Sequence, residues 1–267
     1  MEHLKIVTFN LRCIYNAPID GINSFVHRAG LILDKLRAEK PHIVCFQEVS
    51  DPIRGFLEAS LPDYGLVGHG RLEHYNGEGL SIAYRKDCME LFGLEQFWLS
   101  PTPYVPASRY PEQSIYPRLC VCATVKHKEM TQPVRVYNVH LDHISDQARI
   151  LGITQIAEKA ARESLCNPLP CFIMGDFNAT PDSRTITYCK TGSPYPMTEL
   201  TEGIGETFHN FFREGSTDPN AGKQIDYVFC DRETAKKAVQ TEKWTDCANG
   251  IYLSDHYPIC CTLDFSV

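Results

Sequence analysis

Eight short apolar runs recur along the chain, and several of them are rich in Val, Ile, Phe and Tyr. Runs of this length and composition, bounded by turn residues, are typical of β-strands. The expected strands cover residues 4–9, 42–47, 80–85, 119–125, 134–141, 171–177, 225–230 and 259–265.

Two longer segments repeat apolar residues at the spacing of one helix face. Residues 24–39 stop shortly before Pro41, and residues 146–165 stop before Asn167 and Pro168. Proline cannot continue a helix, and it disfavours the helical conformation of the residue before it. We therefore expect a helix over each segment.

No Gly/Ser-rich or charged linker divides these elements. The pattern predicts one domain over residues 1–267, with two packed sheets flanked by helices. The proline-rich residues 101–117 and the turn-forming residues 213–224 are expected to be surface loops, which either border a site or only connect strands.

Charge narrows the range of partners. The 267 residues include 26 Lys and Arg against 33 Asp and Glu, a formal charge of −7 without a basic arm. This balance argues against tight binding to long nucleic acids, although a local basic rim is compatible with it. No segment is apolar over the length of a signal sequence or a membrane span, so we expect a cytoplasmic protein without a membrane partner.

The twelve cysteines do not form a recognisable metal or disulfide pattern. No Cys-x-x-Cys pair occurs, and seven cysteines lie inside apolar runs. Buried free thiols are the expectation.

Polar residues stand at or near the ends of the expected strands. They are Asn10, Glu48, His140, Asp176, Asn178, Asp226, Asp255 and His256. Taken singly, each is explained as a turn, surface or core residue. Together they form the pattern of a site assembled at the edge of a rigid sheet.

The chemistry of this set indicates phosphate-ester hydrolysis. Carboxylates and amides are the ligands that Mg²⁺ prefers, with Mn²⁺ as a substitute, and zinc-type ligand spacing is missing from the sequence. Histidines beside such a metal can orient the attacking water, protonate the leaving oxygen or stabilise the developing charge.

Six motifs in order resemble those of the endonuclease/exonuclease/phosphatase superfamily, which includes deoxyribonuclease I, abasic-site endonucleases, deadenylases, sphingomyelinases and inositol-polyphosphate 5-phosphatases. The motifs are TFNLR (8–12), PHIVCFQEV (41–49), NVHLDH (138–143), GDFNATP (175–181), IDYVF (225–229) and SDHYPI (254–259). The resemblance implies an α/β four-layer sandwich, in which two mixed, mainly antiparallel sheets pack face to face between helices. It also implies a Mg²⁺-dependent phosphodiesterase or phosphatase site at one end.

The resemblance further implies roles for the strand-end residues. Glu48 is the expected main metal ligand, with Asn10 beside it and Asp255 completing the metal side. Asp176 is expected to orient or activate the water, and Asn178 to hold the phosphate.

The remaining roles concern the imidazoles. His256, polarised by Asp226, is expected to act at the scissile phosphate, and His140 is the second imidazole. Which histidine serves as acid and which as base stays open. Glu78 matches a carboxylate that orients the first histidine in family nucleases, although a solvated loop Glu is an equal alternative.

Arginines complete the expected site. Arg118 resembles a family residue facing the phosphate, with a salt-bridged edge Arg as the alternative. Arg71 and Arg109 are expected to contact substrate from two loops, together with His74, Tyr75, Tyr104, Tyr110 and Tyr116.

The stretches FWLSPTP (97–103), LDHISDQAR (141–149) and DGINSFVHR (20–28) resemble those of compact bacterial hydrolases near the deadenylase branch. The charge of −7 favours a small phosphorylated metabolite, sugar phosphate or nucleotide over duplex DNA as the expected substrate. The alternatives are a nuclease acting on RNA or DNA and a non-catalytic phosphate-binding domain on the same fold. No protein partner is implied.

Overall fold

The computed structural model describes residues 3–266, and two six-stranded sheets form its centre. The strands of the first sheet, in spatial order, are β11 (Ala238–Lys243), β14 (Ile259–Leu263), β1 (Leu4–Asn10), β2 (Ile43–Val49), β4 (Gly79–Arg85) and β3 (Tyr64–Val67). Those of the second are β5 (Met89–Trp98), β6 (Leu119–His127), β7 (Val134–His140), β8 (Cys171–Asp176), β10 (Asp226–Asp231) and β9 (Met197–Glu199).

Each sheet has one parallel pair near its middle, β1 with β2 and β7 with β8, and the other neighbours are antiparallel. A parallel pair brings the carboxyl ends of two strands to the same edge of a sheet. The residues that follow β1, β2, β7 and β8 therefore gather at one end of the molecule.

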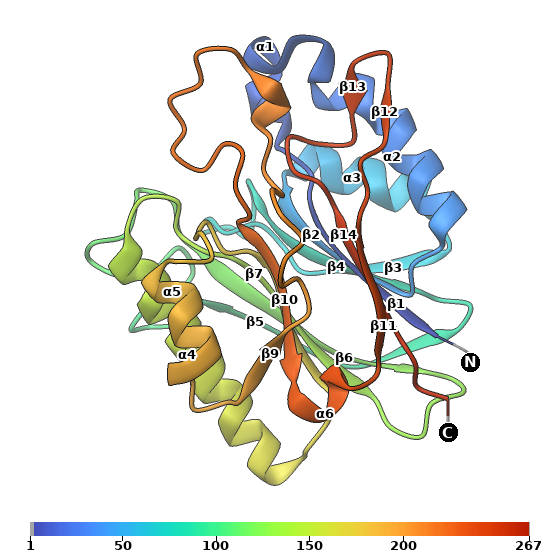
Figure 1. Cartoon of the computed structure of the whole chain (residues 1–267), viewed down its shortest axis with the longest axis vertical. Coiled ribbons are helices and arrows are strands. Elements are labelled where there is room, and N and C mark those ends of the chain that lie inside the picture. Colours follow the sequence, from blue (N-terminus) through green and yellow to red (C-terminus); the bar gives the residue numbers. More distant parts are fainter. Residues whose placement is uncertain (1–2, 267) are drawn as a thin grey trace.

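Helices cover the outer faces of both sheets (Figure 1). The first sheet packs on α2 (Phe25–Glu39) and α3 (Asp51–Ser60), and the second packs on α4 (Asp146–Cys166). This arrangement confirms the four-layer α/β sandwich.

The strands are nearly continuous in hydrophobicity because both of their faces are buried. On β1, Leu4 and Ile6 join the core between the sheets, whereas Val7 and Phe9 pack under the helices. Alternation along the strand thus divides one apolar run between two cores.

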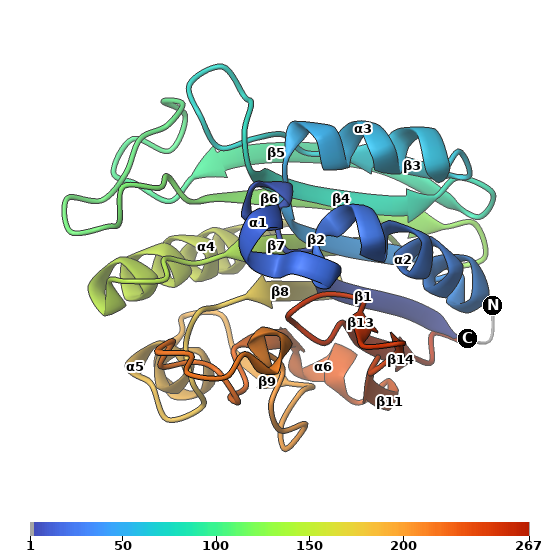
Figure 2. The ribbon, with the colours of Figure 1, turned by 90° about the horizontal axis from the view of Figure 1, so that it is seen from above.

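Short elements lie mainly around the ends of the sheets. The helical ones are η1 (Ile14–Asn16), α1 (Ala17–Asp20), η2 (Gly21–Asn23), α5 (Arg184–Thr187), the π-helical turn η3 (Tyr188–Gly192), η4 (Asn210–Phe212) and α6 (Arg232–Ala235), and a small hairpin joins β12 (Cys247–Ala248) to β13 (Ile251–Tyr252). Figure 1 shows α1 and the orange segment before β10 together at the top, and Figure 2 views that end. An ion pair between Asp20 and Arg213 joins the two segments.

All eight expected strands and both expected helices are present, with boundaries shifted by at most two residues. The elements that were not expected are the short ones named above together with α3, β3, β5, β9 and β11. The middle of β5 alternates exposed and partly buried positions, and Glu90, Glu95 and Gln96 interrupt its apolar residues.

Other expectations are also met. Residues 101–117 and 213–224 contain neither helix nor strand, and the seven cysteines of the apolar runs are buried free thiols. Across residues 3–266, no helix has the length and apolarity to cross a membrane.

Candidate active site

The inward-facing positions of the strands change from apolar to polar toward one end of the molecule. On β8, Phe172 and Met174 belong to the core between the sheets, and Asp176 follows on the same face. His140 of β7 and Asp226 of β10 are the register partners of Asp176. Paired residues point to the same side of a sheet, so these three side chains stand in one row.

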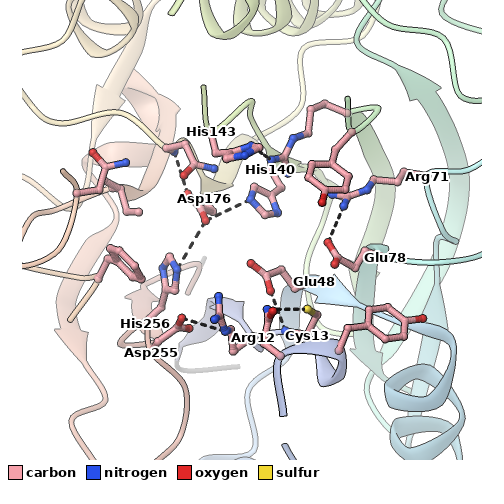
Figure 3. Close-up of a pocket in the computed structure, with 18 of the residues that line it drawn as sticks. Arg12, Cys13, Glu48, Arg71, Glu78, His140, His143, Asp176, Asp255 and His256 are labelled. Atoms are coloured by element: carbon pink, nitrogen blue, oxygen red, sulfur yellow. Dashed lines mark hydrogen bonds and ion pairs between the residues drawn. The ribbon is translucent and has the colours of Figure 1, made fainter. Parts of the chain in front are cut away.

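Asp176 is the centre of a buried hydrogen-bond cluster (Figure 3). Its Oδ2 accepts from Asn10 Nδ2 at 2.9 Å and lies 3.4 Å from His140 Nε2 and 3.8 Å from His256 Nε2. Its Oδ1 accepts from the backbone N–H of Asn178 at 2.8 Å. Burial and the neighbouring Asp226 raise the pKa of Asp176 to about 7.

A chain of hydrogen bonds holds His256 in place. Its Nδ1 lies 2.8 Å from Asp226 Oδ2, which also accepts from the Thr207 hydroxyl at 2.7 Å. The same hydroxyl oxygen accepts from the backbone N–H groups of Ile225 and Asp226. Burial alone lowers the pKa of His256, but the carboxylates of Asp226, Asp176 and Asp255 together outweigh burial and raise it to about 10.

His140 has the opposite electrostatic environment. Burial and the nearby Arg118 guanidinium lower its pKa well below the ordinary value. The site therefore pairs a cationic imidazole, backed by a carboxylate, with a neutral one that faces an arginine.

Glu48 reaches the site because β2 is irregular at that point. The β2–β4 register shifts between Phe46 and Val49, and Glu48 has a φ of 59°. A regular strand would turn its side chain away from the face that Gln47 presents, and a bulge re-aims it. Glu48 Oε2 accepts from the backbone N–H of Cys13 at 2.7 Å, and its Oε1 accepts from Asn10 Nδ2 at 3.3 Å.

Arg12 lies beside the carboxylates of Glu48 and Asp255. Its Nε lies 3.4 Å from Asp255 Oδ2 and also hydrogen-bonds to Asp20. Burial disfavours the charged form of Glu48, but Arg12, the Cys13 backbone N–H, His256 and Asn10 together outweigh burial and lower the Glu48 pKa. Both Glu48 and Asp255 are therefore set beside a positive charge.

The GDFN turn needs its glycine. Gly175 has a φ of 148°, and a Cβ there would lie 1.9 Å from the carbonyl oxygen of Val139 on the parallel strand. Only glycine allows the two backbones to approach so closely. Asn178, at φ 48°, donates from Nδ2 to the Leu141 carbonyl at 3.1 Å and thereby ties the turn to β7.

Glu78 does not orient a histidine, contrary to the expectation. Its Oε2 pairs with Arg71 Nη2 at 2.7 Å, and His140 instead faces Asp176. The loop between β3 and β4 brings Arg71 and Glu78 to the same wall, where an ion pair satisfies both charges.

A cavity of about 610 Å³ opens over the cluster. Nine of the expected residues line it: Glu48, Arg71, Glu78, Arg118, His140, Asp176, Asn178, Asp255 and His256. Asn10 and Asp226 lie behind the wall, in contact with Asp176 and His256.

Arg109 is outside this cavity, which corrects its expected substrate contact. Its guanidinium instead donates to the Ser114 carbonyl at 2.7 Å within the proline-rich loop. Of the aromatic residues and the histidine expected on the two loops, Tyr116 lines the cavity, whereas His74, Tyr75, Tyr104 and Tyr110 do not.

Several residues at the site were missed as site residues by sequence reasoning. Arg12, Cys13, His143, Phe208, Asp218 and Asn220 line the cavity, and Thr207 supports Asp226. Arg12 lies inside the TFNLR motif, and His143 ends NVHLDH, so the motifs carried a signal for both. Thr207 lies far from any catalytic motif along the chain, so only the fold reveals it.

The donor set fits a hard divalent metal. Glu48 and Asp255 present carboxylates to the cavity from one wall (Figure 3). Burial and Glu48 raise the pKa of the Cys13 thiol far above its ordinary value, so this cysteine stays protonated and is a poor ligand. Oxygen donors without a thiolate suit Mg²⁺ or Mn²⁺ better than zinc.

A second group of potential metal ligands lies deeper. Side-chain atoms of Asp176, Asp226 and His256 come within 4.8 Å of one another. However, Asp226 Oδ2 already accepts from Thr207 and contacts His256 Nδ1. These contacts favour a hydrogen-bonded relay over a metal cage at this position.

Comparison with known proteins identifies the family. The model of the Endonuclease/Exonuclease/phosphatase family matches residues 7–256. The chain belongs to this family. Its members are phosphoester hydrolases, such as phosphatases and nucleases, and they generally use divalent metals.

Solved structures of the endonuclease/exonuclease/phosphatase fold superpose on nearly the whole chain. A family protein from Bacteroides vulgatus is 25% identical, with 100% of both chains covered and a TM-score of 0.87. The mannosyl-6-phosphatase Bt3783 of Bacteroides thetaiotaomicron VPI-5482 is 23% identical, covering 97% of this chain and 98% of its own, with a TM-score of 0.82. D. rerio TDP2, complexed with a single-strand DNA product, is 17% identical over 98% of this chain and 99% of its own, with a TM-score of 0.71.

Proposed function

We propose that this protein is a Mg²⁺-dependent phosphohydrolase, with Mn²⁺ as a substitute, that cleaves a phosphate mono- or diester by attack of water. The observation that carries the proposal is the cluster on Asp176 Oδ2, where Asn10, His140 and His256 converge within 2.9–3.8 Å. Residues 1–267 act as one domain in this proposal.

The metal would be held by Glu48 and Asp255, with Asn10 fixing Glu48 from behind. When bound, a divalent cation supplies positive charge to the phosphoryl oxygens and to the leaving oxygen. Arg12 favours the ionised form of Glu48 and forms an ion pair with Asp255 that orients its carboxylate.

Asp176 is the proposed acceptor of the proton from the attacking water. The Asn10 amide and the Asn178 backbone N–H fix both of its oxygens, so its orientation is set before substrate arrives. A carboxylate whose pKa lies near neutrality is suited to taking up a proton during the reaction. Asn178, at the cavity wall, holds a phosphoryl oxygen.

His256 and His140 are proposed to serve different steps. Asp226 holds His256 protonated, so Nε2–H can neutralise a phosphoryl oxygen or donate to the leaving group. His140 is neutral and donates or accepts a hydrogen bond at the phosphate without adding charge. The two imidazoles thereby divide acid catalysis and positioning between them.

Charge and cavity size support a small phosphorylated metabolite, sugar phosphate or nucleotide as substrate. The chain carries a formal charge of −7, and the cavity of about 610 Å³ has the size of small-ligand pockets. The fold shared with a mannosyl-6-phosphatase is consistent with this class. A nuclease is the second candidate, because TDP2 has the same fold and was crystallised with single-strand DNA product.

A substrate panel tests the proposal. p-Nitrophenyl phosphate, bis-p-nitrophenyl phosphate, sugar phosphates, nucleotides and labelled single- and double-stranded oligonucleotides are each incubated with Mg²⁺, Mn²⁺ or EDTA. We expect metal-dependent release from a small ester. Cleavage of oligonucleotides at nanomolar enzyme with small esters untouched would establish the nuclease, and no turnover of any compound would favour a phosphate-binding domain.

A further inference from the structure

Arg118 is a buried arginine with unused hydrogen-bonding capacity. It lines the cavity and is 5% exposed, yet its Nε and Nη1 have no hydrogen-bond partner among residues 3–266. Its Nη2 contacts His143 Nδ1 at 3.1 Å. A buried charged group with unpaired donors is costly, so we expect these nitrogens to bind a partner that the described residues do not supply.

Asp142 compensates this charge only loosely. Its Oδ2 lies 4.0 Å from Arg118 Nε. That oxygen already accepts from the Ser114 backbone N–H and hydroxyl, and Oδ1 accepts from the N–H groups of Ile144 and Ser145. The carboxylate is therefore committed to holding its own loop.

The groups beside Arg118 on this wall include a second arginine and a neutral histidine. Arg71 lies on the same wall, and together with burial it lowers the pKa of Arg118 to about 10. Arg71 has Glu78 as its ion-pair partner and stacks 4.8 Å from the centre of the Tyr116 ring. His143 is neutral because burial and Arg118 lower its pKa.

This wall adjoins His140 but lies away from His256 and Asp255. Figure 3 shows Arg71 and Glu78 across the cavity from His256 and Asp255, with His140 between the two sides. In the proposed function, His256, Asn178 and the metal already attend the reacting phosphoryl group. The arginine wall is thus available to another part of the same substrate.

We infer that Arg118, Arg71 and His143 form a subsite for a second anionic group, so that the preferred substrate is a phosphoester whose leaving part carries a further phosphate or a carboxylate. This inference rests on the proposed function for the identity of the first group. Binding at the subsite uses only side chains of the chain and can therefore be measured without turnover.

The test compares matched ligands by isothermal titration calorimetry of the full chain in EDTA, where no hydrolysis is expected. Fructose 1,6-bisphosphate against fructose 6-phosphate tests a second phosphate, and 3-phosphoglycerate against glycerol 3-phosphate tests a carboxylate. We expect at least one pair to differ about tenfold or more in Kd, the size of a hydrogen-bonded charge pair. The pair that differs identifies the source of the second anion.

Arg118→Met keeps most of the side-chain volume and removes the charge. We expect the Kd ratio of the discriminating pair to fall to about 1–2, with the Kd of the single-anion ligand within threefold of wild type. Arg109→Met, on the same loop but outside the cavity, is the matched control and should keep the full ratio. Circular dichroism and thermal melting check folding, and Arg71→Gln provides the second variant if Arg118→Met does not fold.

Three results would overturn the inference. They are equal Kd values for both pairs in the wild type, no binding of any of the four ligands, and equal weakening of both members of a pair by Arg118→Met. The last result would place Arg118 at the scissile phosphate. Failure of the proposed function is distinct, because it appears as missing metal-dependent turnover whatever the Kd ratios are.

Discussion

The two ends of the core between the sheets carry similar residue types, but the hydrogen-bond partners of their histidines differ. One end is the candidate site, with Asp176, His140 and His256. At the other end the rings of His42 and His127 pack edge to face 5.4 Å apart, and Cys88 completes a group of potential metal ligands. Both ends therefore look suited to chemistry when side chains alone are counted.

Hydrogen bonding separates the two ends. His42 Nδ1 accepts from the Lys5 backbone N–H at 3.0 Å, and His127 Nδ1 accepts from that of Glu129 at 3.1 Å. Each neutral ring then carries its proton on Nε2 and has no lone pair left for a metal. His256 instead places Nδ1 against Asp226, which makes its Nε2 available to the cavity. The partner of Nδ1, more than the histidine itself, decides whether a site can act.

The largest expected effect is loss of turnover from the candidate site. His256→Ala should lower kcat by about 10³-fold or more, because it removes the charged donor beside the phosphoryl group. The matched variant His127→Gln, at the opposite end, should keep kcat within twofold. Circular dichroism establishes that both variants are folded, and equal losses in the two variants would contradict the comparison.

Metal dependence should also depend on the candidate site and not on the end of the core that holds His42 and His127. EDTA should abolish turnover, and Mg²⁺ should restore it. Glu48→Gln should raise the metal concentration for half-maximal activity by about 10- to 100-fold, because it removes a ligand charge. His42→Asn should leave that concentration unchanged in the same titration. A shift in His42→Asn as large as in Glu48→Gln would mean that the opposite end binds the metal.

A smaller effect is expected from the support behind His256. Asp226→Asn removes the carboxylate that fixes the ring but keeps the imidazole, so kcat should fall less than in His256→Ala, by about 10²-fold. Thr207→Val removes only the hydroxyl bond to Asp226 and should cost about tenfold. If Thr207 is a positioning residue, its loss also shifts the pH profile of kcat. An unchanged profile with lower stability would make its role purely structural.

The smallest effect concerns stability at the opposite end. Burial and the nearby Arg85 lower the pKa of His42 to about 4 from its ordinary 6.5. Unfolded His42 then binds its proton more readily than folded His42, so the stabilisation present above pH 6.5 is lost as pH falls toward 4. Because His42 is partly exposed, we expect this loss in the free energy of unfolding to be about 1–2 kcal/mol. The free energy of unfolding, measured by urea unfolding, should decrease less between pH 7 and pH 4.5 in His42→Asn than in the wild type.

Much of the fold could be predicted from the sequence because a strand that is buried on both faces has a continuous apolar run. The eight expected strands are of this kind, whereas the two long helices bury one side and show helical periodicity. The strand β5 was missed because Glu90, Glu95 and Gln96 interrupt its apolar positions. Its identity depends on pairing with β6, a contact that local composition does not record.

Less of the candidate site than of the fold could be predicted from the sequence. Motifs located Glu48, Asp176 and His256 because a turn after a strand displays its polar residues in the sequence. The partners of Glu78 and Arg109 were wrong, since a loop residue pairs with whatever the fold places beside it. Glu78 meets Arg71 rather than an imidazole, and Arg109 serves its own loop.

The sequence by itself determined which residue types stand at the strand ends. It also determined the alternation by which successive side chains of a strand lie on opposite faces of the sheet. Tertiary structure decided their charge states and their aim. Asp226 and the neighbouring carboxylates make His256 cationic, burial and Arg118 keep His140 neutral, and a bulge in β2 turns Glu48 toward the cavity. The physical reason is that pKa and orientation depend on neighbours brought together across two sheets, from positions far apart in the chain.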